Sequence, residues 1–325
     1  MTRFMHRIVF NCNQTKQQGF GHFFRCLNFA RHLKRENKFL ISFTGRFSPF
    51  SSSTLKEENF RILPLKCDKD LFDLVSNFDF IVTDRYDINQ DHLDKLSCNK
   101  LIKSIVLDDF YKLDFSNHDL IVNFRVGINY QYCRVKNKAL GENFFIYKPE
   151  LDKIRSNYQF RPVVNKLLFF GTGTNKSNSK FNELPAFLIS EFPQLKIIHI
   201  TNQPLDISSE QYIPKAYTNS IETFFQGIDA IINGGGLIKY ESAFCGIPSA
   251  TLSITRDQNE DTEILADKGL LFNLGNQEIE NKKVIQERLF HFIKDVNLRK
   301  TIHEKGRLLF TPKSINNLIE KIYEL

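Results

Sequence analysis

The sequence predicts an α/β protein of two domains, each built around a doubly wound parallel sheet, and three observations lead to this prediction. Short runs rich in β-branched and aromatic residues alternate with charged, helix-compatible stretches, which is the pattern of βαβ units. The alternation starts again after Arg161-Pro162. The length of 325 residues corresponds to roughly two domains. We expect a first domain over residues 1–155 and a second over 156–325, facing each other across a cleft.

The expected elements follow this alternation. Strands are predicted in the first half at 7–11, 39–43, 80–83, 104–107 and 120–123, and in the second half at 166–170, 195–200, 229–232 and 249–252. Helices are predicted at 180–191, 237–245, 259–268, 285–296 and 314–323. Pro185 disfavours the first of these helices unless it lies in the first turn. Pro312 can start the last one, which can pack back on the first domain.

Composition and charge predict a soluble globular protein with a small anionic ligand. Lys and Arg outnumber Asp and Glu by 44 to 37, but no run of five like charges occurs, which favours a phosphate-bearing small molecule over nucleic acid. No apolar stretch reaches the roughly 18 residues of a spanning helix, and no apolar leader precedes the first strand. We therefore predict a cytoplasmic protein without stable membrane insertion, whose oligomeric state the sequence leaves open. Phe occurs 32 times and Trp never, so the core should depend on Phe.

No metal or cofactor is expected. The six cysteines are too dispersed for a CxxC motif and are predicted to be free thiols. The histidines at 118, 199, 291 and 303 lack the spacing of metal ligands.

A glycine-rich turn with a histidine follows the first expected strand. Gly19-Phe20-Gly21-His22 opens a helix that carries Arg25. The glycines allow a tight turn and a close approach to a ligand, and a helix N-terminus favours an anion. The helix dipole disfavours imidazolium, so a neutral His22 could act as a base. A plain strand-to-helix turn with a capping histidine explains the same residues without catalysis.

Acidic residues follow two further strands of the first domain. Asp84-Arg85-Tyr86 comes after the apolar run at 80–82, and Asp108-Asp109 comes after 104–107. Polar side chains at the carboxyl ends of parallel strands point into the ligand crevice. Adjacent residues on an extended chain face opposite ways, so at most one of Asp108 and Asp109 should look into it. The alternative for Asp84 is a cap of the next helix.

The strongest motif is a triple glycine in the second domain. Asn233-Gly234-Gly235-Gly236-Leu237 separates a strand from a helix that carries Tyr240 and Glu241. Exposed amides at such a turn can hold a diphosphate, and Glu241 could accept hydrogen bonds from ribose hydroxyls. Gly171-Thr172 is a weaker phosphate-loop candidate, and Gln258 follows the strand at 249–252. A tight turn needed only for packing is the competing interpretation of the triple glycine.

Taken together, these residues resemble the UDP-sugar hydrolases of the pseudaminic-acid pathway, which are relatives of the spore-coat polysaccharide proteins and of GT-B glycosyltransferases such as the one that makes lipid II. The resemblance covers most of the chain. It is carried by Gly19–His22 with Arg25, by Asp84-Arg85-Tyr86, by Asp108-Asp109 with 118–123, and by 140–151. It implies two Rossmann-like domains in a GT-B-like arrangement.

The resemblance also implies an activity and a set of site residues. The implied reaction is hydrolysis of a UDP-linked 2,4-diacetamido-2,4,6-trideoxy-hexose by water attack at the anomeric carbon, in nonulosonic acid biosynthesis. The alternative is a GT-B glycosyltransferase that passes the sugar to a carbohydrate or lipid acceptor; a non-catalytic nucleotide-sugar sensor is disfavoured by His22. The expected catalytic residues are His22, Asp84, Tyr86 and Asp109. The expected substrate-binding residues are Gly19, Gly21, Arg25, Gly171, Thr172, Asn233, Gly234, Gly235, Gly236, Leu237, Tyr240, Glu241 and Gln258.

Overall fold

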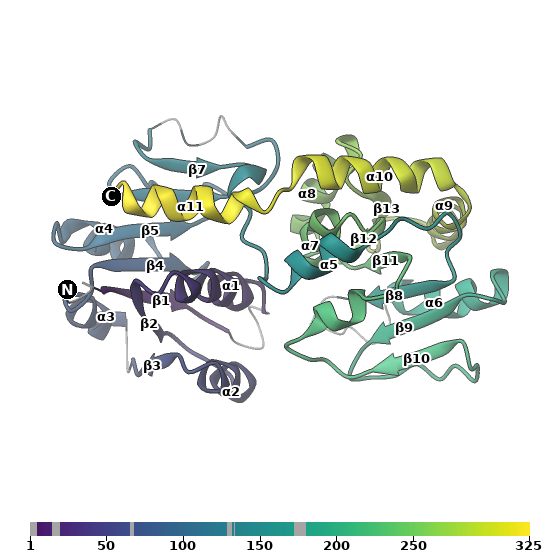
Figure 1. Cartoon of the computed structure of the whole chain (residues 1–325), viewed down its shortest axis with the longest axis horizontal. Helices are drawn as coiled ribbons and strands as arrows, with labels where there is room; N and C mark the ends of the chain where they lie inside the picture. Colours follow the sequence, from purple (N-terminus) through teal and green to yellow (C-terminus); the bar gives the residue numbers. More distant parts are fainter. Residues whose placement is uncertain (1–4, 15–19, 66–67, 129–131, 133, 172–179) are drawn as a thin grey trace. The chain divides into compact units, whose positions relative to one another are not determined.

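The computed structural model of the chain describes residues 5–14, 20–65, 68–128, 132, 134–171 and 180–325. The chain divides into two compact units (Figure 1). Unit 1 comprises Met1–Pro149 and Pro312–Leu325, and unit 2 comprises Glu150–Thr311. The sequence-predicted boundary between residues 155 and 156 falls inside helix α5 (Leu151–Asn157), which belongs to unit 2.

Unit 1 contains a seven-stranded parallel sheet in the order β3-β2-β1-β4-β5-β6-β7. Its strands are β1 (His6–Cys12), β2 (Phe39–Thr44), β3 (Arg61–Leu63), β4 (Phe80–Asp84), β5 (Lys103–Leu107), β6 (Leu120–Asn123) and β7 (Lys138–Leu140). Its helices are α1 (Gly21–Arg35), α2 (Pro49–Glu57), α3 (Asp68–Val75), α4 (Gln90–Cys98), the short 3-10 helix η1 (Glu142–Phe144) and the C-terminal α11 (Lys313–Tyr323).

Unit 2 contains a six-stranded parallel sheet in the order β10-β9-β8-β11-β12-β13. Its strands are β8 (Lys166–Phe170), β9 (Lys196–Ile200), β10 (Tyr212–Lys215), β11 (Ala230–Asn233), β12 (Ser249–Ser253) and β13 (Phe272–Asn276). Its helices are α5, α6 (Lys180–Glu191), η2 (Ile221–Phe225), α7 (Ile238–Cys245), α8 (Arg256–Asp267), α9 (Lys282–Lys294) and α10 (Val296–Leu309).

The two-sheet α/β architecture confirms the predicted fold class, and both sheets have the same kind of switch point. The strand order reverses between β1 and β4 in unit 1 and between β8 and β11 in unit 2. Ligands of doubly wound domains bind outside the carboxyl ends of the strands at this point. Each unit therefore has one position where polar residues after a strand can meet a ligand.

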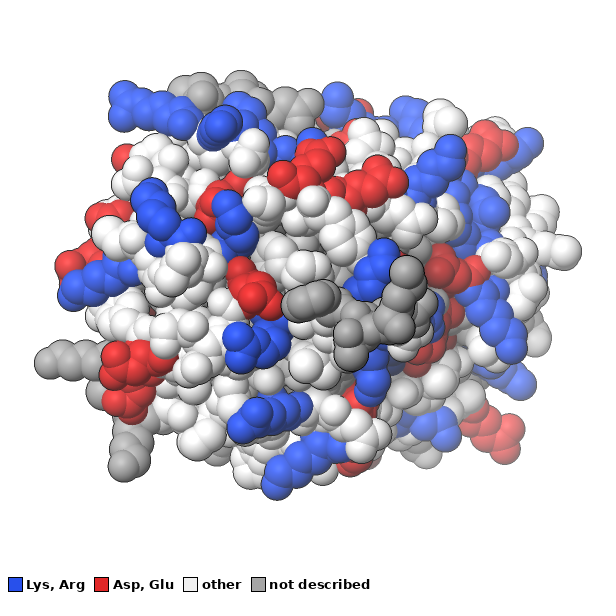
Figure 2. Space-filling model, turned by 60° about the vertical axis from the view of Figure 1, so that its left-hand side comes forward, with Lys and Arg blue, Asp and Glu red and all other residues white. Residues whose placement is uncertain are grey.

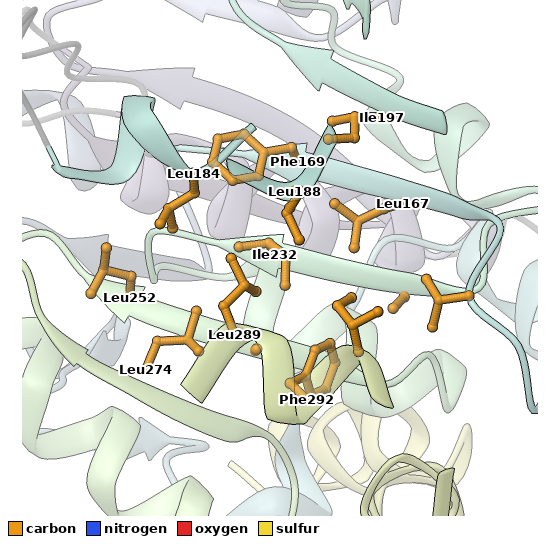
Figure 3. Close-up of a cluster of buried hydrophobic side chains, with 14 of the residues drawn as sticks. Leu167, Phe169, Leu184, Leu188, Ile197, Ile232, Leu252, Leu274, Leu289 and Phe292 are labelled. Atoms are coloured by element: carbon orange, nitrogen blue, oxygen red, sulfur yellow. The ribbon is translucent and has the colours of Figure 1, made fainter. Parts of the chain in front are cut away.

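Burial patterns explain why these segments form these elements. In β4 all five residues are buried, as expected for a central strand covered on both faces. In α1 ten of the fifteen residues are buried, including six in succession, so the helix is covered on more than one face. Figure 3 shows side chains of β8, β11, β12 and β13 packed with those of α6 and α9 in the core of unit 2.

Phenylalanine dominates the large side chains of both cores, as the composition predicts. Those that are fully buried include Phe10, Phe23, Phe29, Phe43 and Phe145 in unit 1, and Phe169, Phe181, Phe225, Phe244, Phe292 and Phe310 in unit 2. The rings pack on one another: Phe10 stacks on Phe43 at 5.1 Å between centroids, and Phe169 lies 4.3 Å from Phe181. Phe thus supplies the volume that Trp and Met do not.

Four strands were missed by the sequence analysis, namely β3, β7, β10 and β13. All four lie at an edge of a sheet, because each ends its strand order. An edge strand is covered less completely than a central one, so its sequence need not be a continuous apolar run. β10 contains Pro214, and β13 contains Gly275 at φ +106°. Both residues are tolerated in edge strands, and both weaken the sequence signal.

Three of the predicted helices contain or adjoin a residue that affects where the helix begins or ends. α6 spans the predicted 180–191, although Pro185 lies inside it and not in its first turn. The helix predicted to end at 296 ends at Lys294, because Asp295 caps the next helix, α10, by accepting a hydrogen bond from the backbone N–H of Leu298 at 2.9 Å. Pro312 lies at the N-cap of α11, as predicted. α11 packs on unit 1, where the Ser314 hydroxyl donates to the Phe145 carbonyl at 2.9 Å.

Charges of both signs are mixed on the face of the molecule that Figure 2 shows, where Lys and Arg side chains are interspersed with Asp and Glu side chains. None of the helices in the described ranges combines the length and the apolar character needed to cross a membrane.

Candidate active site

The switch point of unit 1 brings two of the predicted residues together. His22 is the second residue of α1, and Asp84 is the last residue of β4. Cys12, at the end of β1, is the register partner of Asp84, so the two strands end side by side. His22 is 7% exposed and Asp84 is fully buried. Asp84 therefore does not cap the following helix; Asn89 caps α4.

His22 and Asp84 form a close pair. The Nδ1 atom of His22 lies 2.6 Å from Oδ1 of Asp84. Burial alone would raise the pKa of Asp84, but the positive charge of Arg25 and the contact with His22 outweigh it, so the pKa lies well below its usual range. An ionised carboxylate accepts a hydrogen bond, which assigns the proton to Nδ1. Nε2 is then the ring nitrogen that can accept a proton.

Arg25, one turn further along α1, connects Asp84 with a second carboxylate. Its Nε and Nη2 atoms donate to the two oxygens of Asp84 at 2.7 and 2.6 Å, a bidentate pair. Its Nη1 atom donates to Oδ1 of Asp109 at 2.6 Å. The side chain is 6% exposed. The sequence analysis placed Arg25 in substrate binding; in the structure its nitrogens are engaged by protein carboxylates.

Tyr86 lies on the other side of His22. Its hydroxyl donates to Oδ2 of Asp109, and its ring meets the His22 ring at 4.0 Å between centroids in an edge arrangement. Desolvation and the Asp109 carboxylate raise the pKa of Tyr86 far above its usual value, so the hydroxyl keeps its proton. The residue is 53% exposed. The four predicted catalytic residues thus lie in one connected cluster.

The adjacent aspartates face different partners, as predicted. Asp109 contacts Arg25 and Tyr86, whereas Asp108 accepts from the hydroxyl of Tyr132 and from the backbone N–H of Tyr111. Burial raises the pKa of Asp108, while these hydrogen bonds act in the opposite direction. Only Asp109 belongs to the His22 cluster.

Gly21 shows no backbone conformation that is special to glycine. Its φ is not positive, and a Cβ built on it would meet none of the described residues within 4 Å. Gly19 lies outside the described residues.

In unit 2 the triple glycine has the predicted place between β11 and α7, at the switch point. Gly235 and Gly236 have φ of +104° and +77°, a region that L side chains rarely adopt. A Cβ on Gly235 would lie 2.8 Å from Oε1 of Gln258 in α8. Leu237, the N-cap of α7, makes no side-chain capping hydrogen bond. The first amides of α7 are therefore left to another partner.

Two buried amide groups beside this turn are incompletely satisfied. Oδ1 of Asn233 accepts from the backbone N–H of Gly235 and from Thr251, both at 3.0 Å. Nδ2 of Asn233 and Oε1 of Gln258 make no hydrogen bond to any residue that the structure describes. Leaving such a group unsatisfied costs about 1–3 kcal/mol. A polar ligand at the turn would remove this cost.

The two predicted residues of α7, Tyr240 and Glu241, differ in burial. Tyr240 is buried, and its hydroxyl donates to Asp261 at 2.6 Å; Lys239 forms a 2.5 Å ion pair with the same carboxylate. Tyr240 thus joins α7 to α8, which carries Gln258. Glu241 is half-buried in the first turn of α7. Gly171 directly follows β8, and Thr172 lies outside the described residues.

Sequence reasoning missed Lys239 and Asp261. Each is an ordinary charged residue of an amphipathic helix by its local pattern. Their burial is the only signal, and it appears only when the helices are packed.

Comparison with known proteins supports the fold and a coarse relationship. No protein-family model matches the chain. The chain is similar to the spore coat polysaccharide biosynthesis protein SpsG of Bacillus subtilis, with 21% identity over 332 residues, which cover 95% of this chain and 96% of SpsG. It is 24% identical over 278 residues to the uncharacterized protein MJ1062 of Methanocaldococcus jannaschii, covering 78% of this chain but only 57% of that protein.

Solved structures show the same architecture over nearly the whole chain. MurG of Acinetobacter baumannii matches with a TM-score of 0.68 at 15% identity, covering 99% of this chain and 100% of MurG. Arabidopsis thaliana UGT89C1 matches with a TM-score of 0.72 at 11% identity, covering 98% and 99%. The chain has the GT-B fold. The predicted likeness to spore-coat polysaccharide proteins and to GT-B glycosyltransferases is therefore confirmed, whereas membership of the UDP-sugar hydrolases of the pseudaminic-acid pathway stays a prediction.

Proposed function

We propose that this protein is a nucleotide-sugar enzyme that transfers a sugar from UDP to an acceptor hydroxyl in polysaccharide biosynthesis. The observation that carries the proposal is the buried His22–Asp84 pair at the switch point of unit 1. A histidine held at Nδ1 by a carboxylate has Nε2 available as a general base. The GT-B fold adds support, because UGT89C1 has been solved with UDP-L-rhamnose.

The proposed reaction assigns a part to each unit. In unit 1, Nε2 of His22 accepts the proton of the acceptor hydroxyl while Asp84 stabilises the imidazolium that forms. The acceptor oxygen bonds to the anomeric carbon, and the bond from that carbon to the diphosphate oxygen breaks. In unit 2, the amides of the triple glycine and the start of α7 bind the diphosphate that carries the released charge.

The buried amides of unit 2 would complete the donor site. Nδ2 of Asn233 is a donor suited to a phosphate oxygen, and Oε1 of Gln258 is an acceptor suited to a sugar hydroxyl. Glu241, in the first turn of α7, would accept from the ribose hydroxyls. Binding would thus satisfy two amide atoms that have no hydrogen-bond partner among the described residues.

We favour sugar transfer to an acceptor over hydrolysis because of the proteins that this chain resembles. SpsG is named for polysaccharide biosynthesis, and the similar solved structures include a forosaminyltransferase. Hydrolysis of a UDP-linked diacetamido sugar, predicted from the sequence resemblance, would use the same base with water as the acceptor. It stays a prediction for the experiment to decide.

The test is UDP release from a panel of UDP-sugars with and without carbohydrate and lipid acceptors. Acceptor-dependent release that the His22→Asn variant abolishes is the expected result. Equal release in the absence of any acceptor would assign hydrolysis instead. Failure of UDP to bind, measured by calorimetry on the folded protein, would overturn the proposal as a whole.

A further inference from the structure

Arg25 occupies the centre of the unit 1 cluster. Its guanidinium donates to both oxygens of Asp84 and to one oxygen of Asp109, with all three distances between 2.6 and 2.7 Å. Asp84 in turn contacts His22, and Asp109 accepts from Tyr86. One side chain therefore links the pair that contains the base to a second hydrogen-bonded pair.

Charges of both signs surround His22 in this cluster. Arg25 contributes a positive charge, and Asp84 and Asp109 contribute negative charges. A positive neighbour disfavours an imidazolium, and a negative neighbour favours it. Burial strengthens these interactions, because water screens them poorly in the interior.

The other titratable groups near the pair add no charge. Burial raises the pKa of Cys26, whose thiol donates to Oδ2 of Asp84 at 3.7 Å, and the pKa of Tyr86 is raised as well. Both stay neutral. The charged groups of the cluster are therefore Arg25 on α1, Asp84 on β4 and Asp109 after β5. Arg125, after β6, lies at its border, where its Nη1 atom donates to the backbone carbonyl of Asp109 at 2.8 Å.

We propose that Arg25 is a positioning residue for His22: it holds Asp84 against the imidazole and, with Asp109, sets the pH at which His22 takes up a proton. The inference deepens the proposed function, since it concerns the same base. It differs from the role in substrate binding that the sequence resemblance implied for Arg25. Two substitutions, one that removes a negative charge and one that removes a positive charge, distinguish this role from a purely structural one.

The experiment is an NMR pH titration of the protein labelled at its histidine rings, with the His22 signal assigned by its loss in His22→Asn. Asp109→Asn removes a negative charge, so the imidazolium is less stabilised and the titration midpoint should move to lower pH. Arg25→Gln removes the positive charge, so the midpoint should move to higher pH. A charge within about 4–6 Å shifts such a midpoint by about one to three units.

The matched control lies on the same helix. Arg31 forms an ion pair with Glu58, with Nε 2.9 Å from Oε2, and Arg31→Gln should leave the His22 midpoint unchanged. Opposite shifts in the two test variants support the proposal. Unchanged midpoints, or shifts in the same direction, overturn it. If Arg25→Gln does not fold, Asp109→Asn keeps the test, because that residue is at the edge of the cluster with a side chain 16% exposed.

Activity then separates this inference from the proposed function. Arg25→Lys keeps the charge but cannot form the rigid two-carboxylate fork. With a UDP-sugar substrate, we expect it to lower kcat about tenfold or more with KM for the donor within a few-fold. The titration requires no substrate, so midpoints that shift as expected in a protein without UDP-sugar activity would retain the electrostatic role and reject the function. If kcat of Arg25→Lys falls only in proportion to the fraction of folded protein, the role of Arg25 is purely structural.

Discussion

The two units share a topology, but their candidate sites differ in chemical composition: one is built from charged side chains and the other from backbone and neutral amides. At the switch point of unit 1, charged side chains meet and satisfy one another, with Arg25 between Asp84 and Asp109. At the switch point of unit 2, the site consists of glycine backbone and neutral amides. Asn233 and Gln258 each keep a buried polar atom without a hydrogen bond to the part of the chain that the structure describes. The charged groups of unit 1 are therefore paired with one another before a ligand binds, whereas the site in unit 2 keeps hydrogen-bonding capacity for a ligand.

This difference indicates a division of labour. A group that moves a proton must be oriented before the substrate arrives, which a closed ion-pair network achieves. A group that binds must keep hydrogen-bonding capacity for its ligand, which unpaired amides and free backbone N–H groups achieve. Substitutions in unit 1 should therefore affect turnover, and substitutions in unit 2 should affect nucleotide affinity.

The largest expected effect comes from His22→Asn. Asparagine keeps some hydrogen bonding to Asp84 but is not a base, and general-base catalysis contributes about 10²-fold to 10⁴-fold. Turnover of a UDP-sugar should fall by that factor, while UDP affinity measured by calorimetry should stay within a few-fold. His291→Asn, an exposed histidine of α9, is the control. A folded His22→Asn enzyme that retains near-parental turnover would remove His22 as the base.

Glu241→Ala tests the converse in unit 2. Loss of a hydrogen bond to a charged group costs about 1.5–3 kcal/mol. UDP affinity should therefore fall roughly tenfold to a hundredfold, since each 1.4 kcal/mol is about a factor of ten. Glu260→Ala, at an exposed position of α8, should bind UDP normally. An unchanged calorimetric affinity in folded Glu241→Ala would count against the ribose contact.

Gly235→Ala should have a smaller effect on the same measurement. A side chain in the left-handed region costs about 1–2 kcal/mol, and the new Cβ would displace the Gln258 amide. We expect UDP affinity to fall about tenfold. Gly227→Ala carries a similar strain at φ +73° with no neighbour within 4 Å, so it should lower stability without changing affinity. Equal affinity losses in both variants would attribute the effect to general destabilisation.

The smallest effect concerns acid stability and is shared by both units. Burial lowers the pKa of His118 in unit 1 and of His199 in unit 2 to about 4. In the unfolded chain the pKa of each is about 6.5. The unfolded state binds more protons between these values, so the stability from the neutral rings is complete above about pH 6.5 and is lost as the pH falls toward 4.

For each histidine, the loss between pH 6 and pH 5 should be about 1 kcal/mol. Urea unfolding at these pH values measures it. His199→Phe should reduce the pH dependence by removing the contribution of unit 2. A free energy of unfolding that does not change over this range would contradict the burial of both rings.

Much of the scaffold was determined by the sequence itself. Apolar runs bounded by polar stretches predicted the central strands, because a strand covered on both faces must be apolar along its length. The triple glycine was placed correctly between a strand and a helix, since positive φ leaves a local signature in residue type. Edge strands such as β3 (Arg61–Leu63) were not found, because partial exposure removes the apolar pattern.

The chemistry of the unit 1 cluster was decided only by the tertiary structure. The sequence offered His22, Arg25, Asp84 and Asp109 as separate candidates, and it assigned Arg25 to the substrate. Arg25 and Asp84 are 59 residues apart, and Arg25 and Asp109 are 84 apart. They meet because β4 pairs with β1 while β2 and β3 lie on the other side of β1. Which strands become neighbours depends on packing of the whole sheet, and no local pattern of residues encodes it.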